Sequence, residues 1–320
     1  MLKNTKKLIT SYFSEEIKKA LEGIDDLTFE EIEEIRIRVK KPIIIKMGRK
    51  ELFLTRHGTL LEHEPTTGLD MYKPEMSEIS KILELISSYS LYAFEEEIKN
   101  GYITLAGGHR VGLTGRAVLE KGEVKTIRNV NGFNFRISHE IIGCASNVLE
   151  YIAKGDVKNT LIISPPACGK TTLLRDLARQ ISDGVESIIK GQAVAIVDER
   201  SEIAGSYMGI PQNDVGLRTD VLDGCPKDYG MLVLLRAMAP RVIVVDEIGR
   251  QSDIFAIESI INAGVKLICS VHGNGIEDIL QKPILSDLIH KKVFDRFVVL
   301  QEGYHQDIYN ENFKLLNFKP

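Results

Sequence analysis

The sequence contains no tryptophan and only four cysteines among its 320 residues. No two cysteines form a C-x-x-C pair, so the pattern predicts neither a zinc site nor a disulfide framework and favours a reducing compartment. No apolar run reaches membrane-spanning length, and the basic N-terminal stretch lacks the apolar segment that a secretion signal requires. We therefore expect no transmembrane segment, and any attachment to a membrane has to come from other proteins. The four cysteines are Cys144, Cys168, Cys225 and Cys269.

A large excess of charge is also missing. The formal net charge is −4, from 41 basic and 45 acidic residues, so composition gives no general reason to expect nucleic acid or a membrane surface as a partner. The hydrophobic content of 43% is that of a globular protein with a sizeable core. Disordered and fibrous classes are thereby excluded.

Two kinds of pattern divide the chain. Up to residue 145, helical periodicity at 14–21 and 75–90 is mixed with alternating strands at 34–39 and 42–48, which predicts an α+β domain over 1–145. Over 146–320, short apolar runs alternate with helical segments, as in an α/β domain with a mostly parallel sheet. Such a sheet binds nucleotides at the carboxyl ends of its strands. Residues 209–230 are predicted to form a long, turn-rich loop.

Residues 164–172 read SPPACGKTT between a predicted strand and a predicted helix. This is the context of the phosphate-binding pattern G-x-x-x-x-G-K-[ST], with serine in place of the first glycine. Backbone N–H groups at such a helix start wrap phosphates, Lys170 neutralises their charge, and the Thr171 hydroxyl can ligate Mg²⁺. A turn that contains GKTT by chance is the alternative. The predicted nucleotide-binding residues are Ser164, Pro165, Pro166, Ala167, Cys168, Gly169, Lys170, Thr171 and Thr172.

Three further strand ends carry polar side chains. The run at 241–247 ends in Asp246 and Glu247, of which the first can hold Mg²⁺ through water and the second can orient an attacking water. The run at 193–199 ends in Glu199, a candidate base or ligand of a metal-bound water, although solvated acids at the start of a loop give the same pattern. His272 follows the run at 265–272 and either senses the γ-phosphate, links sites between subunits, or is a structural histidine.

Taken in order, these segments resemble those of the secretion ATPases of type II and type IV systems. SPPACGKTTLLRD, IVDERSEIAG, VIVVDEIGR and ICSVHG look like their Walker A, acidic, Walker B and histidine boxes. The stretches GGHRVGLTGRAV, IRNVNGFNFRISHEIIGCA and PQNDVGLRTDVLDGCPKDYGM resemble the stage III sporulation protein AA family of endospore-forming bacteria, over about residues 30–305. The resemblance implies a RecA-like, AAA+-type P-loop ATPase domain that uses ATP and Mg²⁺. Relative to that family's loop, Ser164 and Ala167 replace glycines.

The same resemblance implies a biological role. It points to a cytoplasmic ATPase of the mother cell, recruited by membrane proteins, that powers or assembles the channel complex linking mother cell and forespore. Its relatives are ring-shaped homo-oligomers, generally hexamers, in which arginines of the N-terminal domain reach a neighbouring nucleotide. The candidates for such an arginine are Arg110, Arg116, Arg128 and Arg136, of which at least two are expected to be surface residues of strands instead.

Two other functions remain open from the sequence. RecA-like folds also serve nucleic-acid-dependent ATPases, but the chain has no tryptophan and no series of aromatic residues for base stacking, so a nucleic-acid partner is not expected. A scaffold that binds nucleotide without turnover is the other alternative, and the adjacent acids at 246 and 247 argue against it.

Overall fold

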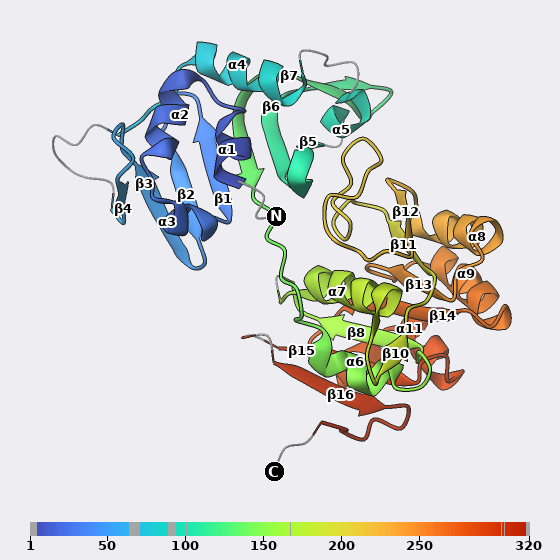
Figure 1. The fold of residues 1–320 in the computed structure, drawn as a ribbon. Coiled ribbons are helices and arrows are strands. Elements are labelled where there is room, and N and C mark those ends of the chain that lie inside the picture. The colour runs from blue at the N-terminus through green and yellow to red at the C-terminus, as the bar shows by residue number, and fades with distance from the viewer. Residues whose placement is uncertain are drawn as a thin grey trace. The chain divides into compact units, whose positions relative to one another are not determined.

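The computed structural model describes residues 5–63, 71–88, 94–99, 101–166, 168–301, 303 and 305–317 (Figure 1). Ala167 of the predicted phosphate loop lies outside these residues. Contacts between residues divide the chain into two compact units, Met1–His139 and Glu140–Pro320. Each unit contains its own sheet and its own helices, so the mixed α/β composition expected from the sequence is confirmed.

The first unit is built on an antiparallel sheet in the order β4-β3-β2-β1-β7-β6-β5. The long hairpin of β6 and β7 lies beside the shorter strands, and a Phe13–Phe135 ring contact at 4.6 Å ties the helical segment to the sheet. The strands are β1 (Glu34–Arg38), β2 (Ile44–Met47), β3 (Lys50–Leu54), β4 (Leu60–Leu61), β5 (Tyr102–Thr104), β6 (Arg110–Glu120) and β7 (Glu123–Arg136).

Local sequence explains where the helices of this unit begin. The Ser14 hydroxyl accepts a hydrogen bond from the Ile17 N–H and caps the second helix, as such residues do before an apolar stripe. The predicted helical segments at 14–21 and 75–90 correspond to α2 and α4, and residues 89 and 90 of the second prediction lie outside the described residues. The helices are α1 (Thr5–Thr10), α2 (Glu15–Glu22), α3 (Asp26–Glu30), α4 (Met76–Ile86) and α5 (Glu95–Lys99).

The second unit contains a sheet in the order β12-β11-β13-β14-β8-β15-β16, in which only the β15–β16 pair is antiparallel among the pairings of the described strands. Successive side chains of its central strands belong in turn to two buried clusters: Ile162 of β8 lies in one, whereas Leu161 and Ile163 lie in the other. The strands are β8 (Thr160–Ser164), β11 (Val194–Asp198), β12 (Thr219–Asp223), β13 (Val242–Val245), β14 (Lys266–His272), β15 (Arg296–Leu300) and β16 (Gln306–Asn310), beside a small hairpin of β9 (Gly184–Val185) and β10 (Ile189–Lys190).

Helices cover both faces of this sheet (Figure 1). Residues of α6 and α7 belong to one buried cluster, and residues of α8, α9 and α11 belong to the other. The bounds are α6 (Ser146–Ala153), α7 (Lys170–Asp183), α8 (Lys227–Ala237), α9 (Gln251–Asn262), α10 (Ile276–Leu280) and α11 (Pro283–His290). Within the described part of the chain, no helix combines the length and the apolar character needed to cross a bilayer.

The predicted loop at 209–230 is only partly a loop. Its centre forms β12, which pairs with β11 in parallel, and its last residues begin α8. Every residue of β12 is half-buried, as on an edge strand, so the segment lacks the continuous apolar character by which the central strands were predicted.

Candidate active site

The parallel register brings the predicted residues to one edge of the second sheet. Ser164 at the end of β8 pairs with His272 at the end of β14, and Val245 at the end of β13 pairs with Cys269 of β14. Because all these strands run in the same direction, the segments that follow them meet at their carboxyl ends. Asp246 and Glu247 are therefore placed beside the start of α7.

The start of α7 has features of an anion-binding helix N-terminus. Gly169 has φ +83°, a left-handed conformation that glycine adopts without a Cβ penalty, and α7 begins at Lys170. The first N–H groups of a helix have no partner within it and attract negative charge. Ser164 is buried, and its hydroxyl donates to the Pro165 carbonyl at 2.8 Å, so the serine fits where the pattern has glycine. Pro166 and Pro165 have no N–H, so amide donors have to come from later residues of the loop.

Lys170 and Thr171 face the two acids that end β13. The Lys170 ammonium lies 2.8 Å from Glu247 Oε1 and 3.8 Å from Asp246 Oδ1, and the Lys170 side chain is only 7% exposed. The Thr171 hydroxyl donates to Asp246 Oδ2 at 3.0 Å. A buried cation, two carboxylates and a hydroxyl from residues more than 70 positions apart thus converge at the helix start.

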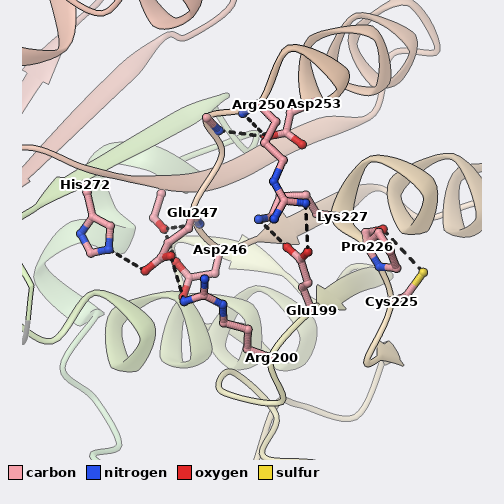
Figure 2. Close-up of polar contacts among 12 residues, drawn as sticks. Glu199, Arg200, Cys225, Pro226, Lys227, Asp246, Glu247, Arg250, Asp253 and His272 are labelled. Carbon is pink, nitrogen blue, oxygen red and sulfur yellow. Dashed lines mark hydrogen bonds and ion pairs between the residues drawn. The ribbon is translucent and has the colours of Figure 1, made fainter. Parts of the chain in front are cut away.

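A serine, a histidine and an arginine complete this cluster. The Ser270 hydroxyl donates to Asp246 and accepts a 3.0 Å hydrogen bond from the Glu247 N–H. His272 Nε2 lies 2.8 Å from Glu247 Oε1, and an Arg200 guanidinium nitrogen lies 3.5 Å from Glu247 Oε2 (Figure 2). The sequence had suggested His272. No role was predicted for Ser270 or Arg200, although Ser270 stands two residues before His272 on the same strand.

Glu247 is held in an unusual conformation and an ionised state. Its φ of +50° is uncommon for a residue with a side chain, and such strain is concentrated at functional sites. Burial acts to raise the pKa of Glu247, but the hydrogen bond and charge of Lys170, with the charges of His272 and Arg200, outweigh it and hold the pKa below its ordinary value.

Glu199 belongs to a neighbouring cluster of its own. Its carboxylate lies 2.5 Å from the buried Lys227 ammonium at the start of α8 and 3.4 Å from the Arg250 guanidinium (Figure 2). Asp253 fixes the chain before α9, because its Oδ2 accepts hydrogen bonds from the N–H groups of Gly249 and Arg250, both at 2.8 Å. Sequence reasoning missed Lys227 and Arg250, which carry no signal apart from their proximity to predicted segments.

Asp198, the residue before Glu199, shapes the loop that follows β11. It is buried, and its two carboxylate oxygens accept hydrogen bonds at 2.8 Å from the N–H groups of Glu202 and Ala204. Arg175 of α7 donates to the carbonyls of Glu202 and Ile203 and so ties the same loop to the helix of the phosphate site. Burial raises the pKa of Asp198 to about 6 despite these hydrogen bonds.

The four candidate arginines lie on one hairpin of the first unit. Arg110 of β6 is directly opposite Arg136 of β7, and Arg116 is opposite Arg128. Like charges placed opposite each other destabilise a pair of strands. The Arg110 guanidinium lies 3.5 Å from the centre of the Tyr102 ring, a contact that offsets part of this cost. Glu34 of β1 offsets another part, because its carboxylate lies 4.0 Å from Arg136 Nε.

Comparisons with known proteins agree with this architecture. A structural alignment with the ATPase DotB from Yersinia pseudotuberculosis covers 89% of this chain and 77% of that protein, at 14% identity and a TM-score of 0.57. The pilus retraction motor PilT with bound ADP matches 94% of this chain and 81% of its own, at 14% identity and a TM-score of 0.55. At such identities these likenesses show the fold alone.

Two sequence relatives differ in how much of the chain they share. The uncharacterised protein ycf45 of Porphyra purpurea is 32% identical over 183 residues, which are 54% of this chain and 31% of that protein. The stage III sporulation protein AA of Bacillus subtilis (strain 168) is 41% identical over 313 residues, which are 97% of this chain and 96% of that protein. The family model for sporulation stage III, protein AA matches residues 3–316. The chain therefore belongs to the stage III sporulation protein AA family.

Proposed function

We propose that the protein is an ATPase that binds ATP with Mg²⁺ at the start of α7 and hydrolyses it, and that its second unit is a RecA-like domain. One observation carries the proposal: the buried Lys170 and the Thr171 hydroxyl meet Asp246 and Glu247 at a glycine-led helix start. The site fits the ligand chemically, because hydroxyl and carboxylate oxygens are the ligands that Mg²⁺ prefers. When bound, the ion would neutralise charge on the phosphates.

Each residue of the cluster has a role in this proposal. Lys170 would exchange Glu247 for phosphate oxygens, and Thr171 and Asp246 would hold the metal. Glu247, ionised by its cationic neighbours, accepts a hydrogen bond from the attacking water at a carboxylate oxygen. His272 contacts the same Glu247 oxygen as Lys170, so it keeps the carboxylate oriented once Lys170 has turned away.

Glu199 is proposed as a second acid of the site. Its carboxylate forms ion pairs with Lys227 and Arg250 beside the strand end of β11. In this position it would order water around the metal, but each of its two oxygens already faces a cation. We therefore assign Glu247, rather than Glu199, as the residue that orients the attacking water.

The cellular role is proposed from the family. The protein would work in the mother-cell cytoplasm as a homo-oligomeric ring, generally hexameric, and membrane proteins of the channel between mother cell and forespore would recruit it. An arginine from the opposed pairs of the β6–β7 hairpin would reach the γ-phosphate held by a neighbouring subunit and stabilise charge during transfer.

Phosphate release by the purified protein with Mg²⁺ and ATP tests the proposal. We expect Lys170→Ala to abolish both ATP binding and turnover, because it removes the charge that holds the phosphates. Glu247→Gln should bind ATP at least as tightly as the wild type but lower turnover by about 100-fold or more, in line with the loss of an activating group. Phosphate release from Lys170→Ala at the wild-type rate would refute the assignment of the site. A nucleotide-binding scaffold would instead show tight binding and no turnover in the wild type.

A further inference from the structure

A cavity of about 240 Å³ lies in the second unit, next to the start of α7. Whole drug-sized ligands occupy pockets of roughly 300–1,000 Å³, so this cavity has room for one ring system rather than for a complete nucleotide. Most of its walls are apolar. They include Gly169 and Leu173 of the phosphate site, Ile141 and Cys144 from the segment before α6, and Leu300 and Gln306 from the β15–β16 pair.

The position of the cavity relates it to the phosphate site. Gly169 lines the cavity and immediately precedes Lys170, and Leu173 follows one turn later on α7. A phosphate chain bound at the amides of this helix start therefore ends within reach of the cavity. We propose that the cavity receives the base of the nucleotide, and that Gln306 selects adenine over guanine there. This inference rests on the proposed function, because it needs the phosphates at Lys170.

The orientation of the Gln306 amide gives the selectivity. Its Nε2 donates a 3.2 Å hydrogen bond to the Cys144 carbonyl, and a carbonyl oxygen can only accept, so the nitrogen has to be the atom that faces it. The side-chain oxygen Oε1 is then the amide atom left to meet a ligand. Adenine presents a donor at its exocyclic N6 amine, whereas guanine presents the acceptor O6 at the corresponding place. Guanine would place its O6 acceptor against the acceptor Oε1 of Gln306, which disfavours guanine binding.

The thiol beside Gln306 does not change this preference. The Cys144 sulfur lies 3.7 Å from the Thr172 carbonyl, and burial, with the nearby charge of Asp176, raises the pKa of the thiol to about 11. Cys144 is therefore a neutral thiol at physiological pH and adds no charge to the cavity. Thr172 and Cys168 also line the cavity, but a hydroxyl can donate as well as accept, so the side chain that presents a fixed acceptor to the base is Gln306.

Competition binding with ATP, GTP and inorganic tripolyphosphate tests the inference on the full-length protein. The wild type should prefer ATP to GTP, and Gln306→Leu should reduce that preference by about fivefold to tenfold, the effect of one hydrogen bond. Tripolyphosphate has no base, so its affinity should not change. Gln301→Leu is the matched control, because Gln301 contacts Asp307 and does not line the cavity. An unchanged ATP to GTP ratio in Gln306→Leu would overturn the selectivity.

A second variant tests the cavity itself. Cys144→Phe places a ring in the cavity and should weaken ATP and GTP by about tenfold or more while it leaves tripolyphosphate binding unchanged. Wild-type affinity for ATP in this variant would overturn the base site. Failure of the proposed function gives a different result: neither ATP nor tripolyphosphate would bind the wild type, or Lys170→Ala would bind both normally.

Discussion

At the scale of single residues, Ser270 organises the two acids of the site. One hydroxyl donates to Asp246 and accepts from the Glu247 N–H, so it fixes the Asp246 carboxylate, which we propose as a metal ligand, together with the strained backbone of Glu247. Groups that orient ligands in this way commonly contribute 10- to 100-fold to metal affinity or activity. We therefore propose Ser270 as a positioning residue for metal binding by Asp246 and for water orientation by Glu247.

We predict that Ser270→Ala lowers kcat by about 10- to 100-fold and raises the Mg²⁺ concentration needed for half-maximal activity. The loss comes from a freed Asp246 carboxylate and from an unpaired Glu247 N–H. Steady-state phosphate release with titrated Mg²⁺ measures both effects. Ser286→Ala is the control, because the Ser286 hydroxyl lies near His290 on α11. A wild-type Mg²⁺ dependence in Ser270→Ala would contradict the positioning role.

At the scale of elements, the strands show what the sequence could and could not predict. β8, β11 and β13 are buried along their whole length, and their continuous apolar runs predicted them. β12 and β16 lie at the two edges of the same sheet and are mostly half-buried, so neither alternation nor an apolar run distinguishes them from loops.

The candidate site divides in the same way. The loop at 164–172 and the acids at 246 and 247 have local sequence patterns from which a site was predicted, and the structure brings Lys170 and Thr171 against these acids. The contacts of Ser270 and Arg200 with the acid pair depend on which strands are neighbours in the sheet, because these residues are distant from the pair in sequence. The left-handed backbone of Glu247 also results from tertiary contacts, since no sequence signal accompanies a positive φ at a glutamate.

The loop after β11 should make stability depend on pH. The folded-state pKa of Asp198, about 6, lies above the ordinary value of 3.8, so folded protein binds the proton more tightly than unfolded protein does. The stability gained from protonation is complete below about pH 4 and is lost as pH rises through 6. A shift of this size corresponds to about 3 kcal/mol.

We therefore predict that Asp198→Asn destabilises the protein more at pH 4 than at pH 7, relative to the wild type. Asparagine can accept with one oxygen only, so one of the two loop hydrogen bonds is lost at every pH, at a cost of about 1–3 kcal/mol. The pH-dependent part of the difference disappears as wild-type Asp198 becomes charged. Denaturant unfolding at both pH values measures it. An equal difference at pH 4 and pH 7 would contradict the pKa argument.

At the scale of the whole molecule, the question is whether one chain contains a complete catalytic site. The acids and Lys170 come from the second unit, whereas the opposed arginines are on the β6–β7 hairpin of the first. In a ring built from head-to-tail contacts, every subunit can offer the hairpin to the next one. Complementation between two inactive proteins distinguishes this arrangement from a site completed within a single chain.

We predict that an alanine variant of the acting arginine and Lys170→Ala are each inactive alone but regain activity when mixed. The Lys170→Ala protein supplies an intact hairpin to the intact phosphate site of the arginine variant. In a head-to-tail ring mixed at random from equal amounts, about a quarter of the sites combine the two, so about a quarter of wild-type turnover should return. Single alanine variants at Arg110, Arg116, Arg128 and Arg136, each mixed with Lys170→Ala, identify the arginine concerned. Restored activity should also fall on dilution, because it exists only in the assembled ring.

An arginine that acts within its own chain gives no recovery, since every subunit with a working Lys170 then lacks the arginine. Absence of recovery from all four mixtures would therefore contradict catalysis between subunits.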